Sequence, residues 1–120
     1  MLAAFNGRPE VRASALERLN GRFRAGTLTP GAMFFNGKLA TPAAALIDNG
    51  DPHVWQARLG LAQWLAFAID YSTASFSGEK IVALVRELLE GIPLGRDTGR
   101  LGSQVVKEVL ASVANELTPS

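Results

Sequence analysis

The sequence has no cysteine and a single histidine, His53. The absence of cysteine excludes disulfide bonds, thiolate nucleophiles and cysteine-ligated zinc or iron–sulfur sites. With one histidine, a catalytic triad or a multi-histidine metal site would have to rely on carboxylates. We therefore predict no catalytic residues, no metal and no cofactor, and we take the cytoplasm as the expected compartment.

Strong charge and long apolar runs are also missing. The formal net charge is +1 and the pI is about 8.2, so the composition does not require a polyanionic partner. The most apolar stretch, residues 59–69, is shorter than the ~20 residues that a membrane span needs. The opening sequence, MLAAFNGRPE, lacks the basic region and apolar run of a secretion signal. We expect no membrane segment.

What the chain does have is a high share of hydrophobic residues, 48% of its 120 residues, against 19% charged residues. This length suits one domain, so we expect a single globular helical domain over residues 1–120. The apolar excess favours a buried central element, or an apolar surface that meets another subunit.

Prolines and glycines predict where helices begin and end. Thr41 and Asp51 each precede a proline and are expected to cap a helix. The expected helices span residues 9–25, 42–47, 52–59, 61–73, 79–90 and a last segment from Asp97 towards Pro119. The predicted fold class is therefore all-α, a compact bundle of five or six helices.

The pair Asn36-Gly37 interrupts the helical pattern between aromatic and aliphatic residues. Asn-Gly is typical of a type I′ turn, so we expect a small β-hairpin near residues 33–40. Such a ribbon is marginal alone and would lean on helices through Phe34 or Phe35. Lys38 lies at the tip of this hairpin, which makes it a candidate interaction residue.

The segment Leu61 to Thr73 is apolar around most of its circumference, which predicts a buried central helix. Gln63 and Asp70 leave one narrow polar strip. The simpler interpretation is that Asp70 pairs there with an arginine such as Arg58. The alternative is an acid with a raised pKa in a ligand pocket beneath the hairpin, lined also by Trp64 or Tyr71.

Two further candidates, His53 and Trp55, belong to the expected helix over residues 52–59. His53 falls in the first turn and is expected to face solvent, with a ligand or catalytic role as the alternative. Trp55 is one of several aromatic residues at near-helical intervals. Core packing explains these rings more simply than a ligand-binding box does.

Arginines gather on the first expected helix, where Arg12, Arg18, Arg22 and Arg24 could form a basic patch. A solvated helix face is the simpler interpretation of this pattern. The alternative is weak binding of nucleic acid through phosphate contacts.

The segments AFNGRPEVRASALERL, ARLGLAQWLAFAID and LLEGIPLGRD, with the Asn-Gly-Lys turn, resemble a family of small uncharacterised bacterial and phage proteins. The residues that agree with the family pattern are Asn6, Gly7, Pro9, Gly37, Lys38, Leu59, Gly60, Leu65, Ala66, Asp70, Ile92, Pro93, Gly95 and Asp97. The chain reads GKLATPAAAL where the family has a cysteine-containing segment, and Arg8 replaces an acidic residue. The resemblance implies architecture and a cytoplasmic location, and it implies no mechanism.

Three functional hypotheses follow from the sequence. The first is a non-enzymatic protein that self-associates as a homo-oligomer or docks on another protein, because the chain is apolar and assembles no catalytic set. The second is weak nucleic-acid binding through the basic patch. The third is a small-ligand pocket beneath the hairpin.

Overall fold

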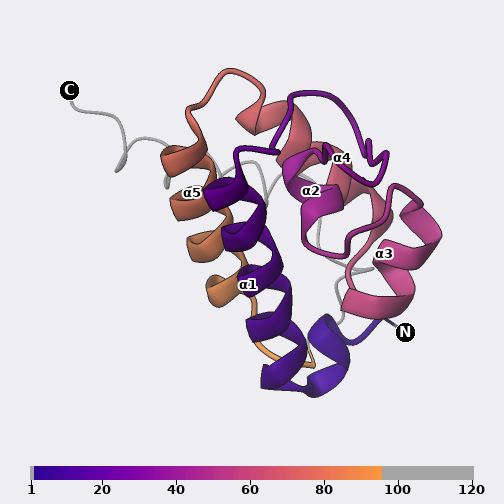
Figure 1. Ribbon diagram of the computed structural model, residues 1–120. Helices are drawn as coiled ribbons and strands as arrows, with labels where there is room; N and C mark the ends of the chain where they lie inside the picture. The colour runs from indigo at the N-terminus through magenta and orange to yellow at the C-terminus, as the bar shows by residue number, and fades with distance from the viewer. Residues whose placement is uncertain (1, 96–120) are drawn as a thin grey trace.

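Three helices begin with a proline at their first or second position, as the sequence predicts. The computed structural model describes residues 2–95, and Figure 1 shows its helices in order. The elements are η1 (Ala4–Gly7), α1 (Pro9–Ala25), α2 (Pro42–Ala45), α3 (Pro52–Leu59), α4 (Gln63–Thr73) and α5 (Gly78–Gly91). The all-α fold class is confirmed, and the helix expected from Asp97 onward lies outside the described residues.

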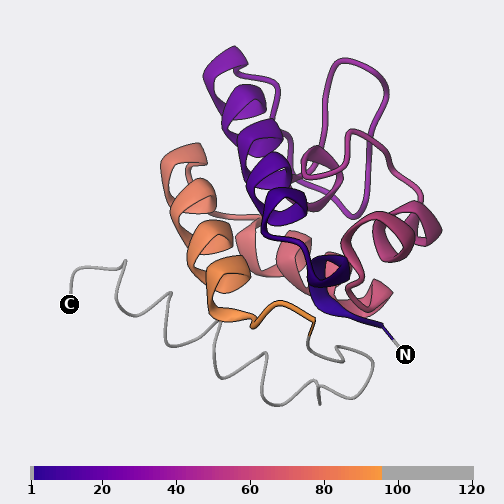
Figure 2. The same ribbon diagram turned by 90° about the horizontal axis from the view of Figure 1, so that it is seen from below.

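The helices form two groups around one core. α1 packs along α5, whereas α2 and α3 both pack against α4 (Figures 1 and 2). The largest fully buried side chains come from η1, α1, α3, α4 and α5 and from the loops between the helices, and α2 buries its three alanines. The large side chains include Phe5, Leu19, Leu46, Trp55, Leu65, Ile69 and Leu88. Apolar burial from every element therefore holds the bundle together.

Glycine in the left-handed conformation ends two of the helices. Gly26 follows α1 with φ 69°, and Gly60 follows α3 with φ 62°. Gly60 is also constrained by space, because a Cβ built there would overlap the carbonyl oxygen of Ala3. The turn after α3 therefore needs glycine for both its backbone angles and its close approach to the N-terminal segment.

The expected hairpin is present only as a chain reversal. Between residues 2 and 95 no regular strand forms, and the segment contains isolated bridges from Ala40 to Phe35 and to Leu28. The side-chain oxygen of Asn36 accepts the amides of Lys38 and Leu39 at 2.9 and 2.7 Å. Asn36 thus begins an Asx-type turn and does not occupy the centre of a type I′ turn.

Thr41 does not cap α2 as expected, since its side chain makes no cap hydrogen bond. Its hydroxyl instead accepts the amide of Phe34 at 3.1 Å, which ties the loop to the start of the helix. Asp51 does cap α3, because its carboxylate accepts the amide of His53 at 2.8 Å. No helix of the described part is both long and apolar enough to cross a bilayer.

Candidate functional site

Asp70 lies on the inner side of α4 and is only 1% exposed. One carboxylate oxygen accepts the amide of Met33 and the other accepts the amide of Ala43, both at 2.8 Å. The expected pairing with Arg58 is wrong, because the Arg58 guanidinium donates to the carbonyl of Ile47 at 2.8 Å. Main-chain donors from two separate segments therefore satisfy this acid.

Burial raises the pKa of Asp70, and the hydrogen bonds from Ala43 and Met33 act in the opposite direction. The hydroxyl of Thr41 also lowers this pKa. Because the carboxylate bonds the loop after α1 and the start of α2, it cross-links three parts of the fold. Each of its two oxygens thus accepts a main-chain hydrogen bond from the protein itself.

The aromatic residues divide between the core and the surface. Trp55 is fully buried, and its indole N–H donates to the carbonyl of Ala62 at 3.1 Å. Trp64 is partly buried against the core. In contrast, Phe67 is 43% exposed and Tyr71 is 88% exposed, so the expectation of a helix buried on all sides is wrong.

Trp64, Phe67 and Tyr71 share one side of α4, which we call the α4 aromatic face. Their spacings of three and four residues bring side chains together on a helix. The opposite side of α4 carries Leu65 and Ile69 into the core. α4 is therefore an amphipathic helix whose outward side is aromatic where a polar side would be usual.

The arginines of the predicted basic patch mostly bond the protein's own carbonyls. Arg12 donates to the carbonyls of Leu89 and Ile92, at 3.5 and 3.2 Å, where α5 ends. Its guanidinium also lies 5.4 Å from the ring centre of Phe5. Arg18 donates to the carbonyl of Leu46 at 2.7 Å, just after α2. Both cations thereby stabilise C-terminal ends of helices.

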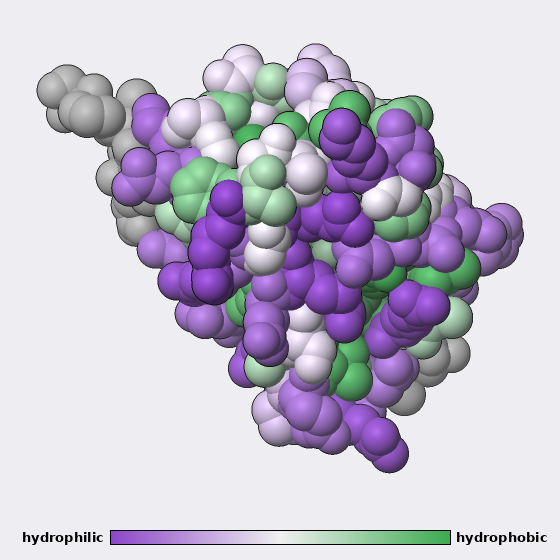
Figure 3. Space-filling model, in the orientation of Figure 1, coloured by the Kyte–Doolittle hydropathy of each residue, from purple (hydrophilic) through white to green (hydrophobic). Residues whose placement is uncertain are grey.

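Arg22 also bonds groups of the protein itself, since it donates to the carboxylate of Asp48 at 3.2 Å and to the carbonyl of Lys38 at 3.0 Å. Its guanidinium lies 5.2 Å from the ring centre of Phe35. Arg24 is exposed and has no hydrogen bond or ion pair to the described residues. Hydrophilic residues nevertheless cover much of the surface over α1 (Figure 3).

His53 and Lys38 are both exposed. The His53 side chain faces solvent as expected, and its Nδ1 lies 3.2 Å from the carboxylate of Asp51. Hydrogen bonds from the backbone and side chain of His53 lower the pKa of Asp51. Lys38 follows the turn at Asn36 and contributes its carbonyl to Arg22. The structure does not join either residue to Asp70.

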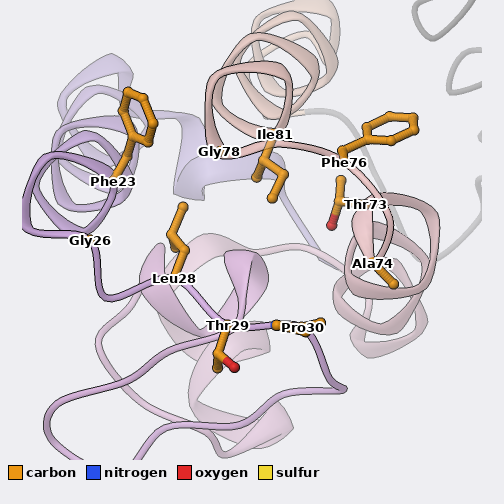
Figure 4. Close-up of a pocket in the computed structure, with 10 residues that line it drawn as sticks. All are labelled: Phe23, Gly26, Leu28, Thr29, Pro30, Thr73, Ala74, Phe76, Gly78 and Ile81. Carbon is orange, nitrogen blue, oxygen red and sulfur yellow. The ribbon is translucent and has the colours of Figure 1, made fainter.

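A pocket of about 290 Å³ opens between the end of α1, the loop after it and the turn from α4 to α5. Figure 4 shows Phe23 and Phe76 at opposite sides of it, with Leu28 and Ile81 pointing between them. The predicted pocket residues Asp70, Trp64 and Tyr71 do not line it. Sequence reasoning missed this pocket, because its walls come from three segments that no local spacing relates.

Comparisons of the chain with protein-family models, with curated proteins and with solved structures found no match. The resemblance to the family of small bacterial and phage proteins therefore stays a prediction.

Proposed function

We propose that this protein is a non-enzymatic interaction module that self-associates through the α4 aromatic face. The observation that carries the proposal is the exposure of Phe67 and Tyr71, 43% and 88%, on a helix whose other side lies in the core. Aromatic residues are enriched at protein interfaces, where they provide large contact areas at a low entropic cost. An uncovered aromatic face therefore fits a surface that is covered in an assembly.

The chemistry of this face favours a second copy of the chain as the partner. None of Trp64, Phe67 and Tyr71 carries a charge at neutral pH. A two-fold interface places the same patch of each subunit against itself. Two uncharged aromatic faces can meet in this way without like-charge repulsion, and aromatic pairs contribute about 0.5–1.5 kcal/mol beyond the area they bury.

The buried polar side chains in residues 2–95 support a structural role over catalysis. These side chains are Thr41, Asp70 and Thr73. Thr41 accepts an amide, Asp70 accepts two amides, and the Thr73 hydroxyl donates to the carbonyl of Ile69 at 2.8 Å. Within the described part of the chain, no buried side-chain nitrogen or oxygen lacks a hydrogen-bond partner. These buried polar side chains therefore serve to connect parts of the fold to one another.

The other two hypotheses gain less support. Nucleic-acid binding would need the arginines of α1 to reach phosphates, yet Arg12, Arg18 and Arg22 bond the protein's own groups. A ligand pocket beneath the reversal at Asn36 would need Asp70 to offer a free acceptor, and both of its oxygens accept amides. Within the described residues, by contrast, Phe67 and Tyr71 of the α4 aromatic face keep 43% and 88% of their surface exposed.

Light scattering coupled to size-exclusion chromatography tests the proposal over a range of protein concentrations. We expect the unmodified chain to shift towards a dimer as its concentration rises, and Phe67→Ser to remain a monomer at concentrations where the unmodified chain is dimeric. Phe34→Ser is the matched control, because Phe34 is a phenylalanine of similar exposure, 45%, in the loop after α1. Circular dichroism checks that both variants fold. A strict monomer at every concentration would overturn the proposal.

A further inference from the structure

We propose that the pocket between α1 and the α4–α5 turn is a binding site for a small, neutral, apolar ring compound of about two fused rings. This site is separate from the α4 aromatic face, since neither Phe67 nor Tyr71 lines it. The inference therefore goes beyond the proposed function and can hold or fail independently of it.

Apolar side chains form the larger part of the pocket lining, and Thr29 and Thr73 contribute polar groups to it. The apolar side chains come from several parts of the chain. Phe23 belongs to α1, Leu28 to the loop after it, and Ile81 to α5. In Figure 4 the side chains of Leu28 and Ile81 point towards each other across the space, and Phe23 borders it. A ligand there would contact aliphatic and aromatic carbon on several sides, which is typical of small-molecule sites.

The volume limits the size of the ligand. An apolar cavity of about 150 Å³ holds a single benzene ring, and ligand sites commonly span about 300–1,000 Å³. At about 290 Å³ this pocket lies just below that range and is about twice the volume of the benzene-sized cavity. It therefore fits about two fused rings better than either a single small ring or a large cofactor.

The charge of the lining limits the chemistry of the ligand. Among residues 2–95, no aspartate, glutamate, lysine, arginine or histidine lines the pocket. The more buried of its two threonines, Thr73, donates its hydroxyl hydrogen to the carbonyl of Ile69. An ionised ligand would lose its hydration without gaining an opposite charge, so the site should select a neutral one.

Gly78 at the start of α5 shapes one wall. A Cβ built on Gly78 would lie 2.7 Å from Cδ1 of Phe23, which is too close for two carbon atoms. The missing side chain thus lets the Phe23 ring lie against the first turn of α5. Gly78→Ala would push this ring aside and change the shape of the pocket.

Nuclear magnetic resonance titration of the full chain with 2-naphthol and with 2-naphthoate tests the site. Both probes have two fused rings, but only the naphthoate is charged at neutral pH. We expect saturable shifts of the Gly26 and Gly78 amides with 2-naphthol, and at least tenfold weaker binding of 2-naphthoate. If neither probe shifts these amides saturably, or if both bind equally, the proposal is overturned.

Two substitutions locate the binding. Ala74 lines the pocket and is exposed, so Ala74→Trp should obstruct the opening and weaken 2-naphthol binding at least tenfold. Ser75→Trp is the matched control, because Ser75 is the next exposed residue and does not line the pocket. Gly78→Ala should weaken binding as well, which keeps the test decisive if Ala74→Trp does not fold. Unchanged affinity in both pocket variants would contradict the proposed location.

Discussion

Asp70 caps the first turn of α2 from a neighbouring helix, with its Oδ1 accepting the amide of Ala43 at 2.8 Å. The residue directly before α2 would ordinarily supply such a bond, and here its side chain makes none. A buried side chain on α4 thus satisfies a donor that the short helix α2 leaves open. This hydrogen bond ties the start of α2 to α4 beside the apolar packing between the two helices.

Replacing Asp70 by alanine should strongly destabilise the fold. The amides of Met33 and Ala43 would lose their acceptor, and each unsatisfied buried donor costs about 1–3 kcal/mol. We expect the free energy of unfolding in urea at neutral pH to fall by about 2–4 kcal/mol. Glu90→Ala is the control, since Glu90 is exposed and its loss should cost less than about 0.5 kcal/mol. Equal stability of the two variants would rule out the capping role.

Comparison of the same variant with the unmodified chain also shows how the contribution of Asp70 to stability depends on pH. Burial raises the pKa of Asp70 in the folded state, so the folded chain holds this proton more tightly than the unfolded chain does. The stability that Asp70 contributes should be greatest below its unfolded pKa of about 3.9 and should decline as pH rises through the folded value. Urea titrations of the unmodified chain and Asp70→Ala should therefore show a stability difference that shrinks from acid to neutral pH. A difference that grows instead would contradict this sign.

Arg12 should contribute to stability through the end of α5. Arg12→Met keeps much of the side-chain length and removes the donors to the carbonyls of Leu89 and Ile92. We expect a loss of about 1–2 kcal/mol in the free energy of unfolding, because these bonds are partly buried and charge-assisted. Arg24→Met provides the comparison, with an expected change below about 0.5 kcal/mol. If both variants lose the same stability, the loss of a positive charge on α1 explains the result better than the loss of the two hydrogen bonds at the end of α5.

Two glycines should respond in opposite ways to alanine. Gly60→Ala should lower the free energy of unfolding by at least about 2 kcal/mol, since the residue has φ 62° and a Cβ there would overlap the carbonyl of Ala3.

Gly21→Ala should instead stabilise the chain by about 0.5–1 kcal/mol, because Gly21 lies inside α1 and a Cβ there meets nothing within 4 Å. Thermal unfolding followed by circular dichroism measures both changes. A destabilising Gly21→Ala would show that α1 is packed more tightly at this point.

Local signals in the sequence predicted most helix starts correctly. Proline at the first turn located α1, α2 and α3, and the amphipathic pattern located α5 within one residue at each end. Asp51 was recognisable as a cap because its acceptor and the amide it bonds are only two residues apart. Where donor and acceptor lie within one helical turn of each other, residue types and their spacing are sufficient to predict the hydrogen bond.

The orientation of α4 could not be predicted in this way. An acid and two aromatic rings on one helix favour an exposed acid and buried rings, yet Asp70 faces inward while Phe67 and Tyr71 face outward. The reason is that the donors for Asp70 come from Met33 and Ala43, far away in the sequence. Irregular loop backbone needs acceptors for its amides, and no periodic pattern shows where such a loop will pass.

The arginine side chains of α1 connect places that are distant along the chain. Arg12 reaches Leu89 and Ile92, Arg18 reaches Leu46, and Arg22 reaches Lys38. Detaching α1 would therefore release three separate regions at once. The molecule should open as one cooperative unit, with amide hydrogens around these regions exchanging at a shared rate.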